Sequence, residues 1–194
     1  MTSFLAVLAI VTIAAVTPGP NNFIVMSAAA RGGVAAALPA MAGVTGGSIA
    51  LLILIGSGFG VLFDALPEVQ MIVRVAGATY LIWLGFCMIR TASLPATQKE
   101  TLSLPQSALG VASFQFMNPK SWVLVTTALS AMGSTVYDML VLAFVFVVVM
   151  GLSLTLWTFI GKLIADWLVD LRFKRMFDTA MGLLLMASAV SLYS

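Results

Sequence analysis

The stretch TPGPNN at residues 17–22 decides how this chain folds, because it lies inside a long apolar segment and cannot continue a helix. Pro18 and Pro20 have no N–H group and clash with the preceding helical turn, while Gly19 adds backbone freedom. A second stretch, FMNPKSW at residues 116–122, interrupts a later apolar segment in the same way. Each stretch predicts a broken helix.

Both stretches contain a pair of residues typical of a helix start. Thr17-Pro18 and Asn118-Pro119 each combine a capping side chain with proline at the first helical position. A helix that begins there would point its unpaired N–H groups and positive dipole end into the membrane. Such an end binds anions, so the carboxylate of an amino acid would fit it. The carbonyl groups freed at the break would accept the ammonium group, and Asn21 and Asn22 add further polar groups.

The composition places these breaks in a membrane. Of the 194 residues, 61% are apolar and 8% are charged, and the mean hydropathy is +1.12. Soluble domains carry about 25% charged residues. A spanning helix needs about 20 apolar residues, and the charged residues delimit six segments of roughly that size. These segments are residues 3–28, 36–62, 69–89, 106–132, 138–161 and 176–194.

The loops between these segments predict the orientation of the chain. Lys and Arg gather on one side of the predicted membrane, which by the positive-inside rule is cytoplasmic, so both termini are expected to be periplasmic. The residues on that side are Arg31, Arg90, Lys99, Lys162, Arg172, Lys174 and Arg175, whereas the other side has Arg74, Asp64, Glu68 and Asp138. Residues 161–175 favour either an amphipathic helix on the membrane surface or an extension of the fifth span.

The two halves of the chain predict an internal repeat. Gly151, Gly161 and Gly182 each have a glycine in the first half at one constant offset, which Ser48 and Ser153 share. We therefore expect a single transmembrane domain, residues 1–194, with repeats at 1–92 and 106–194 and a cytoplasmic linker at 93–105. Three spans per repeat invert the second repeat relative to the first. The predicted fold is an all-α integral membrane protein with six transmembrane helices, of which the first and fourth are broken at mid-membrane.

Lys120 lies near the middle of an apolar span, where a lysine costs about 3 kcal/mol on insertion scales. The sequence offers no acidic partner at the same depth. Lys120 would hold a substrate carboxylate or change charge during transport. The alternative is that its ammonium group reaches the membrane surface or binds backbone carbonyl groups.

Several function classes lack the residues they need. The chain has no histidine, one cysteine and no pair of acidic residues close together within a span, which argues against an enzyme, a metal site or a cofactor. A net charge of +2 argues against nucleic acid as a partner. A metal-ion exporter and a non-transporting membrane scaffold stay as alternatives. Gly43 and Gly47 form a GxxxG pattern, which favours close helix packing.

TPGPNN, GATYLIWLG at residues 77–85 and NPKSW at residues 118–122 together resemble the lysine-exporter (LysE/RhtB-type) family of amino-acid translocators. The resemblance is strongest to the branch that exports homoserine, threonine and cysteine. It implies export of a small, neutral amino acid such as threonine, homoserine, cysteine or O-acetylserine across the bacterial inner membrane, driven by protons in an antiport mechanism with alternating access. Many members carry aspartate near Ser48 and Ser153, where this chain has serine, which leaves Lys120, Asp178 or no residue at all as the proton carrier here.

The expected substrate-binding residues come from the two breaks and the repeated serines. They are Thr17, Pro18, Gly19, Pro20, Asn21, Asn22, Ser48, Gln115, Asn118, Pro119, Lys120 and Ser153. The expected partners are the amino acid, the lipid bilayer and, for coupling, protons. The sequence leaves open which amino acid is carried, which ion is coupled, and whether the chain forms a homodimer.

Overall fold

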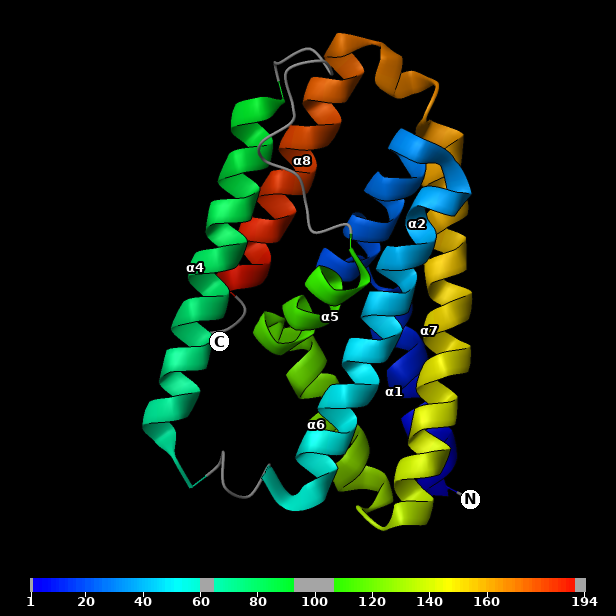
Figure 1. The fold of residues 1–194 in the computed structure, drawn as a ribbon, viewed down its shortest axis with the longest axis vertical. Helices are drawn as coiled ribbons and strands as arrows, with labels where there is room; N and C mark the ends of the chain where they lie inside the picture. Colours follow the sequence, from blue (N-terminus) through cyan, green and yellow to red (C-terminus); the bar gives the residue numbers. More distant parts are fainter. Residues whose placement is uncertain (1, 60–64, 93–106, 191–194) are drawn as a thin grey trace.

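The computed structural model describes residues 2–59, 65–92 and 107–190, and every regular element in these ranges is a helix (Figure 1). The prediction of an all-helical chain is therefore confirmed. The elements are α1 (Thr2–Val16), α2 (Pro20–Leu54), η1 (Ile55–Phe59), α4 (Pro67–Thr91), α5 (Ala108–Met117), α6 (Pro119–Met132), α7 (Val136–Ile164), η3 (Trp167–Val169) and α8 (Leu171–Val190). The whole predicted linker, residues 93–105, lies outside the described residues, as does Asp64.

The first and fourth predicted spans are interrupted rather than merely kinked. α1 ends at Val16 and α2 begins at Pro20, while α5 and α6 are separated by Asn118 alone. Both Gly19 and Asn118 have extended backbone conformations, so neither continues a helix. The prolines therefore stop the helices where the sequence predicted.

α2 consists of two helical sections joined at Gly33, whose φ of 75° and ψ of −174° are not helical. Figure 1 shows α2 rising to one end of the molecule and returning from it. A positive φ suits glycine, which has no Cβ to clash with the following carbonyl. This reversal separates the first predicted span from the second.

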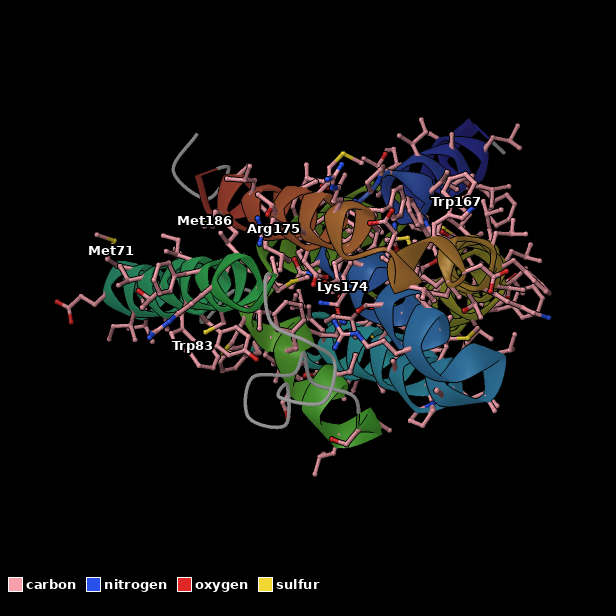
Figure 2. The ribbon with its side chains drawn as sticks, turned by 90° about the horizontal axis from the view of Figure 1, so that it is seen from above. Met71, Trp83, Trp167, Lys174, Arg175 and Met186 are labelled. Carbon is pink, nitrogen blue, oxygen red and sulfur yellow. The ribbon has the colours of Figure 1, made fainter. Side chains whose placement is uncertain are left out.

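Helices α4 and α8 form a pair beside the remaining bundle. The bundle is built mainly by packing of α2 against α7 and α5, and of α1 against α6 and α7, whereas α4 packs chiefly along α8. Figure 2 shows the pair in a view from above, with Met71 and Trp83 on α4 and Arg175 on α8. A Cβ on Gly182 would lie 2.6 Å from the carbonyl oxygen of Gly85, and a Cβ on Gly85 would overlap the carbonyl oxygen of Gly182. The two backbones are therefore in direct contact where they cross.

Gly43 and Gly47 lie where α2 crosses α5. A Cβ on Gly47 would be 2.6 Å from Cγ of Gln115 and 2.7 Å from the carbonyl oxygen of Ala112. A Cβ on Gly43 would overlap the carbonyl oxygen of Ala108. The two missing side chains let α5 approach α2 closely enough to bring Gln115 to the break in the first half.

Two helical segments are long and apolar enough to cross a membrane, namely Pro20–Phe59 and Val136–Ile164. Shorter apolar helices cover Phe4–Val16, Val75–Arg90 and Ala108–Met117. Figure 1 shows that the reversal of α2, the end of α4, the end of α7 and the start of α8 all lie at one end of the molecule. These segments carry the basic residues of the predicted cytoplasmic side.

The structure does not contain the amphipathic surface helix that residues 161–175 suggested. α7 ends at Ile164, the short 3-10 turn η3 covers Trp167–Val169, and α8 begins at Leu171. Asp170 has an extended backbone and accepts the N–H of Arg172 at 2.7 Å, so it ends the turn just before α8 begins. The alternative, an extension of the fifth span, holds as far as Ile164.

Candidate functional site

The first break ends α1 at Thr17, contrary to the prediction that Thr17 caps the next helix. The backbone N–H of Thr17 donates to the carbonyl oxygen of Ile13 at 2.9 Å, and the Thr17 hydroxyl donates to the same oxygen at 2.6 Å. The N-cap of α2 is Gly19, and Pro20 takes the first helical position. Two Xaa-Pro pairs follow each other in TPGP, and the second of them starts the helix.

The start of α2 has no side-chain cap. Gly19 has no side-chain oxygen that could accept a hydrogen bond, and Pro20 has no N–H, so the first backbone donors of the helix are the N–H groups of Asn21 and Asn22. The N–H of Phe23 donates to the carbonyl oxygen of Gly19 at 3.1 Å, which begins the regular helical pattern. α2 therefore begins with backbone donors and a positive dipole end that no side chain caps.

The second break is closed by its own side chain, as the pair Asn118-Pro119 predicted. The N–H of Asn118 donates to the carbonyl oxygen of Gln115 at 3.2 Å, and its side-chain oxygen accepts the N–H of Lys120 at 3.1 Å. The indole N–H of Trp122 also donates to the carbonyl oxygen of Phe116 at 2.9 Å. Pro119 takes the first position of α6. Asn118 thus ends α5 and starts α6.

The carbonyl groups at the end of α1 are bound by protein groups. The Nδ2 of Asn22 donates to the carbonyl oxygens of Ala15 and Thr17, each at 3.0 Å. The hydroxyl of Ser153 donates to the carbonyl oxygen of Ala15 at 2.8 Å. The sequence predicted that an ammonium group of the substrate would find these carbonyl groups, but Asn22 and Ser153 bind them from α2 and α7.

Lys120 crosses from the second break to the first. Its Nζ donates to the carbonyl oxygen of Thr17 at 2.8 Å, so the alternative of binding to a backbone carbonyl describes the present contact. The negative end of the α1 dipole favours a cation at this position. Nζ also lies 3.2 Å from the place where a Cβ of Gly19 would be. The ammonium group therefore lies directly beside the uncapped start of α2.

A cluster of amide groups joins the two halves of the chain next to Lys120. Asn21 and Gln115 exchange two hydrogen bonds, of 3.0 and 2.8 Å, and Asn118 donates to Asn21 at 3.3 Å. The hydroxyl of Ser121 donates to Gln115 at 2.6 Å. Gln115 and Asn118 are 0% and 1% exposed. These bonds hold α2, α5 and α6 in fixed register around the breaks.

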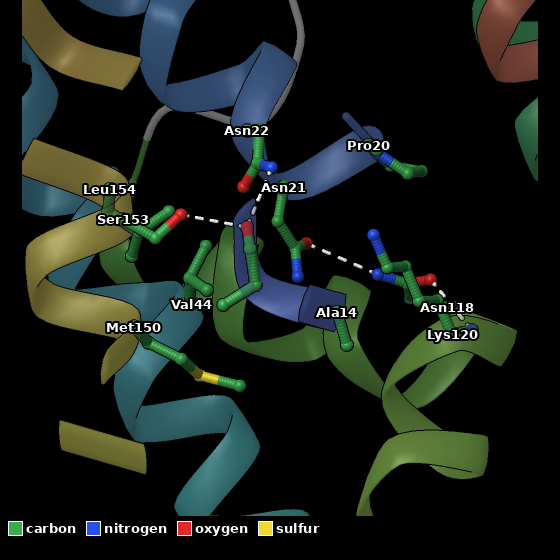
Figure 3. Close-up of a pocket in the computed structure, with 12 residues that line it drawn as sticks. Ala14, Pro20, Asn21, Asn22, Val44, Asn118, Lys120, Met150, Ser153 and Leu154 are labelled. Carbon is green, nitrogen blue, oxygen red and sulfur yellow. Dashed lines mark hydrogen bonds between the residues drawn. The ribbon is translucent and has the colours of Figure 1, made fainter. Parts of the chain in front are cut away.

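The two breaks border a small pocket with a cavity volume of about 40 Å³ (Figure 3). Its polar groups come from Asn21, Asn22, Asn118, Lys120 and Ser153, and Figure 3 shows Asn118 and Lys120 across the pocket from Met150 and Ser153. The lining residues are Ala14, Ala15, Gly19, Pro20, Asn21, Asn22, Val44, Asn118, Lys120, Met150, Ser153 and Leu154. Lys120 carries the single charge among these lining residues.

Several of the predicted site residues do not line this pocket. Thr17 and Pro18 line a neighbouring cavity. Gln115 is not among the residues that line the pocket, but it is hydrogen-bonded to Asn21, which is. Ser48 is 1% exposed, and its hydroxyl has no hydrogen-bond partner among the described residues. Ser121 was not predicted, although its place inside NPKSW beside Lys120 was a signal for it. No pattern in the sequence predicted that apolar residues of α2 and α7 would line the pocket.

The described part of the chain holds no group of three or more His, Cys, Asp or Glu side chains suited to a metal ion. Asp178, which the sequence offered as a proton carrier, is buried on α8 and lies 3.4 Å from Nζ of Lys174. It does not line the pocket at the breaks.

Comparison with known proteins identifies a family and several relatives. The family model described as LysE type translocator matches residues 12–194. An uncharacterized membrane protein of Pseudomonas aeruginosa is 29% identical over 162 residues, which cover 77% of this chain and 75% of that protein. No solved structure matches the chain.

Two further relatives have named activities. A cysteine/O-acetylserine efflux protein of Salmonella paratyphi A is 30% identical over 121 residues, covering 61% of this chain and 59% of the relative. A leucine efflux protein of Klebsiella pneumoniae is 34% identical over 107 residues, covering 54% and 50%. The matched regions thus span between half and three-fifths of the length of these two efflux proteins.

Proposed function

Because this chain belongs to the LysE type translocator family, we propose that it is a secondary transporter that exports a small, neutral amino acid across the bacterial inner membrane. The names of the matched relatives, which include cysteine, O-acetylserine and leucine efflux, support an amino acid as cargo. The observation that carries the proposal is the pocket at the two breaks, where one ammonium group meets an uncapped helix start.

The carboxylate of the cargo binds at the start of α2. The backbone N–H groups of Asn21 and Asn22 and the positive end of the helix dipole attract it, and the Nζ of Lys120 lies next to them. A hydrogen bond to a charged group contributes about 1.5–3 kcal/mol. The amino group of the cargo turns to the side-chain oxygens of Asn22 and Ser153, which line the same pocket.

The remaining wall of the pocket selects a neutral side chain. Val44, Met150 and Leu154 face the cargo from α2 and α7. A second charge on the cargo would have no counter-charge among the lining residues, and burying an unpaired charge is costly. Small apolar or weakly polar side chains suit this wall. Threonine, homoserine, cysteine and O-acetylserine all fall in this class.

The fold is that of two inverted repeats in the membrane. Once α2 is divided at Gly33, each half has the same order: a short helix, a break, a second short helix, a long helix and a final helix. These are α1, the two sections of α2 and α4 in the first half, and α5, α6, α7 and α8 in the second. Each half crosses the membrane three times, which inverts the second half. The basic end faces the cytoplasm, and both termini face the periplasm.

Alternating access comes from movement of the α4–α8 pair against the bundle. Rocking of one repeat against the other does not fit the packing, because α2 packs along α7 and α4 packs along α8, so each main interface joins the two repeats. The α4–α8 pair makes few contacts with the bundle. Movement of this pair therefore disturbs the least packing.

Protons drive the export, and Lys120 carries the coupling. It is the titratable side chain that lines the pocket, whereas Asp178 is held by Lys174 on α8. A lysine that exchanges a proton as cargo enters and leaves would couple the two movements.

The proposal is tested by export from cells that overproduce the chain. A panel of amino acids is measured outside the cells, with and without a protonophore. We expect one or a few small, neutral amino acids to accumulate outside, and the protonophore to abolish this. Accumulation of none of them, or only of charged amino acids, would contradict the proposal.

Lys120→Ala is the decisive variant. We expect its export rate to fall at least about tenfold, because a charge-assisted hydrogen bond to the cargo is lost. Lys162→Ala is the matched control, since it removes the same charge from an exposed site at the end of α7. The amount of each variant in the membrane is measured by immunoblot. Full export by Lys120→Ala would remove Lys120 from the mechanism.

A further inference from the structure

A second cavity adjoins the pocket, on the other side of the first break. It lies between α1, α6 and α8, has a cavity volume of about 390 Å³ and is partly open to the outside. Its walls include Ile10 on α1, Val123 and Thr127 on α6, and Ser188 on α8.

The two cavities share one thin wall. Ala14, Gly19, Pro20, Asn118 and Lys120 line both of them. Across this wall runs the hydrogen bond of 2.8 Å from the Nζ of Lys120 to the carbonyl oxygen of Thr17. Lys120 has the one long, flexible side chain among these five shared residues.

The second cavity extends from the breaks toward the end of the molecule opposite the basic loops. α1 runs from that end to the first break, and α6 runs from the second break back to it (Figure 1). Ile10 precedes the first break on α1, and Thr127 follows the second break on α6. In the orientation proposed above, this cavity faces the periplasm.

We infer that the second cavity is the exit vestibule for the exported amino acid, and that the contact between Lys120 and Thr17 is the barrier that the cargo opens. This inference rests on the proposed function. The carboxylate of the cargo replaces the carbonyl oxygen of Thr17 as the acceptor for Nζ. Thr17 then keeps its hydrogen bond of 3.0 Å from Asn22, so opening the barrier leaves no unpaired carbonyl group.

The lining of the vestibule suits passage rather than tight binding. Thr127 and Ser188 contribute hydroxyl groups among the apolar side chains of Ile10, Val123 and Leu124, and Lys120 at the shared wall is the one charged residue among its described lining. A zwitterion that has left the start of α2 thus meets weak polar partners and then the exterior. A cargo released in this way is not held a second time.

Cysteine labelling from outside tests the inference without requiring transport. Cys87, which is buried on α4, is replaced by alanine, and single cysteines are introduced as Thr127→Cys in the vestibule or Ser153→Cys in the pocket. Right-side-out membrane vesicles are treated with 2-sulfonatoethyl methanethiosulfonate, a small anionic reagent that does not cross membranes. We expect Thr127→Cys to react quickly and Ser153→Cys slowly.

Combination with Lys120→Ala tests the barrier itself. We expect Ser153→Cys to react at least about tenfold faster in this background, because the hydrogen bond that closes the wall is gone. Thr127→Cys should react at the same rate with and without Lys120. Lys120→Arg keeps a cation and should keep the slow reaction of Ser153→Cys, which separates an open barrier from a misfolded chain. Lys162→Ala should also leave both rates unchanged.

Two results would overturn the inference. One is that Thr127→Cys reacts in inside-out vesicles but not in right-side-out vesicles, which would put the cavity on the wrong side. The other is that Ser153→Cys reacts equally fast with and without Lys120→Ala. If labelling follows the expectation while no amino acid is exported, the proposed function and the exit role fail, while the outward-facing cavity and its barrier at Lys120 stand. If export occurs while labelling contradicts the expectation, the exit path alone is wrong.

Discussion

The two breaks occupy corresponding places in the two halves of the chain, yet the protein completes them differently. At the second break, the side chain of Asn118 caps α6 and one residue joins the two helices. At the first break, three residues separate α1 from α2, and the cap of α2 is a glycine without a capping group. The second break is thus closed by its own side chain, while the first leaves backbone donors uncapped, and the proposed function assigns these donors to the carboxylate of the cargo.

The largest expected effect comes from making the first break resemble the second. Gly19→Asn adds a side-chain oxygen that can cap α2, and it would compete with the carboxylate of the cargo for the N–H groups of Asn21 and Asn22. We expect the export rate to fall at least about tenfold, since a hydrogen bond to a charged group is worth about 1.5–3 kcal/mol. The measurement is export of the identified amino acid at equal protein levels.

Gly19→Ala is the matched control for this variant. The extended backbone at residue 19 accepts a Cβ, which would lie 3.2 Å from the Nζ of Lys120 and displace it slightly. We expect a smaller loss of export than with Gly19→Asn. Equal losses in the two variants would show that crowding of Lys120, and not capping of α2, is responsible.

An intermediate effect is expected when the cap of the second break is removed. Asn118→Ala loses the bond to the N–H of Lys120 and the bond to Asn21 in a fully buried position. We expect the free energy of unfolding in detergent to fall by about 1–3 kcal/mol. Ser107→Ala removes an exposed cap, which accepts the N–H of Gly110 at 3.1 Å, and should cost about 1 kcal/mol or less. An equal cost for both would contradict a special role of Asn118.

The smallest effect separates the two repeated serines. Ser153 donates to the carbonyl oxygen of Ala15, whereas the hydroxyl of Ser48 has no partner among the described residues. Ser153→Ala should therefore lower the free energy of unfolding by about 1 kcal/mol, and Ser48→Ala should leave it unchanged or raise it slightly. Thermal unfolding in detergent measures both. The reverse order of the two effects would refute this distinction.

The sequence predicted the breaks because proline lacks an N–H and clashes with the preceding helical turn, and at each break it follows a residue suited to a helix start. Pro39 has no such residue before it and lies inside α2. The sequence also predicted the Asn118 cap, because an asparagine directly before a proline has one good helical position. The exact end of α1 was not predictable, because Thr17-Pro18 and Gly19-Pro20 are both acceptable helix starts. Contacts between distant segments decide it: Asn22, Ser153 and Lys120 hold the carbonyl groups at the end of α1.

The partner of Lys120 shows the same limit. Its acceptor, the carbonyl oxygen of Thr17, is far away in the sequence. Every residue has a backbone carbonyl group, so no pattern of side chains predicts which one Lys120 will bind. The pattern of residues 161–175 misled for a related reason. Leu, Ile and Trp are spaced there as on one face of a helix, but the extended backbone at Asp170 interrupts the helical conformation, and α8 begins at the next residue.

The crossing of α4 and α8 has a consequence for how the two halves of the gene can diverge. Gly85 and Gly182 each occupy the space beside the other's carbonyl group, so a mutation that adds a methyl group at one site cannot be compensated by shrinking the other, which is already glycine. At this crossing the two halves are tied together, and selection acts on both positions as one.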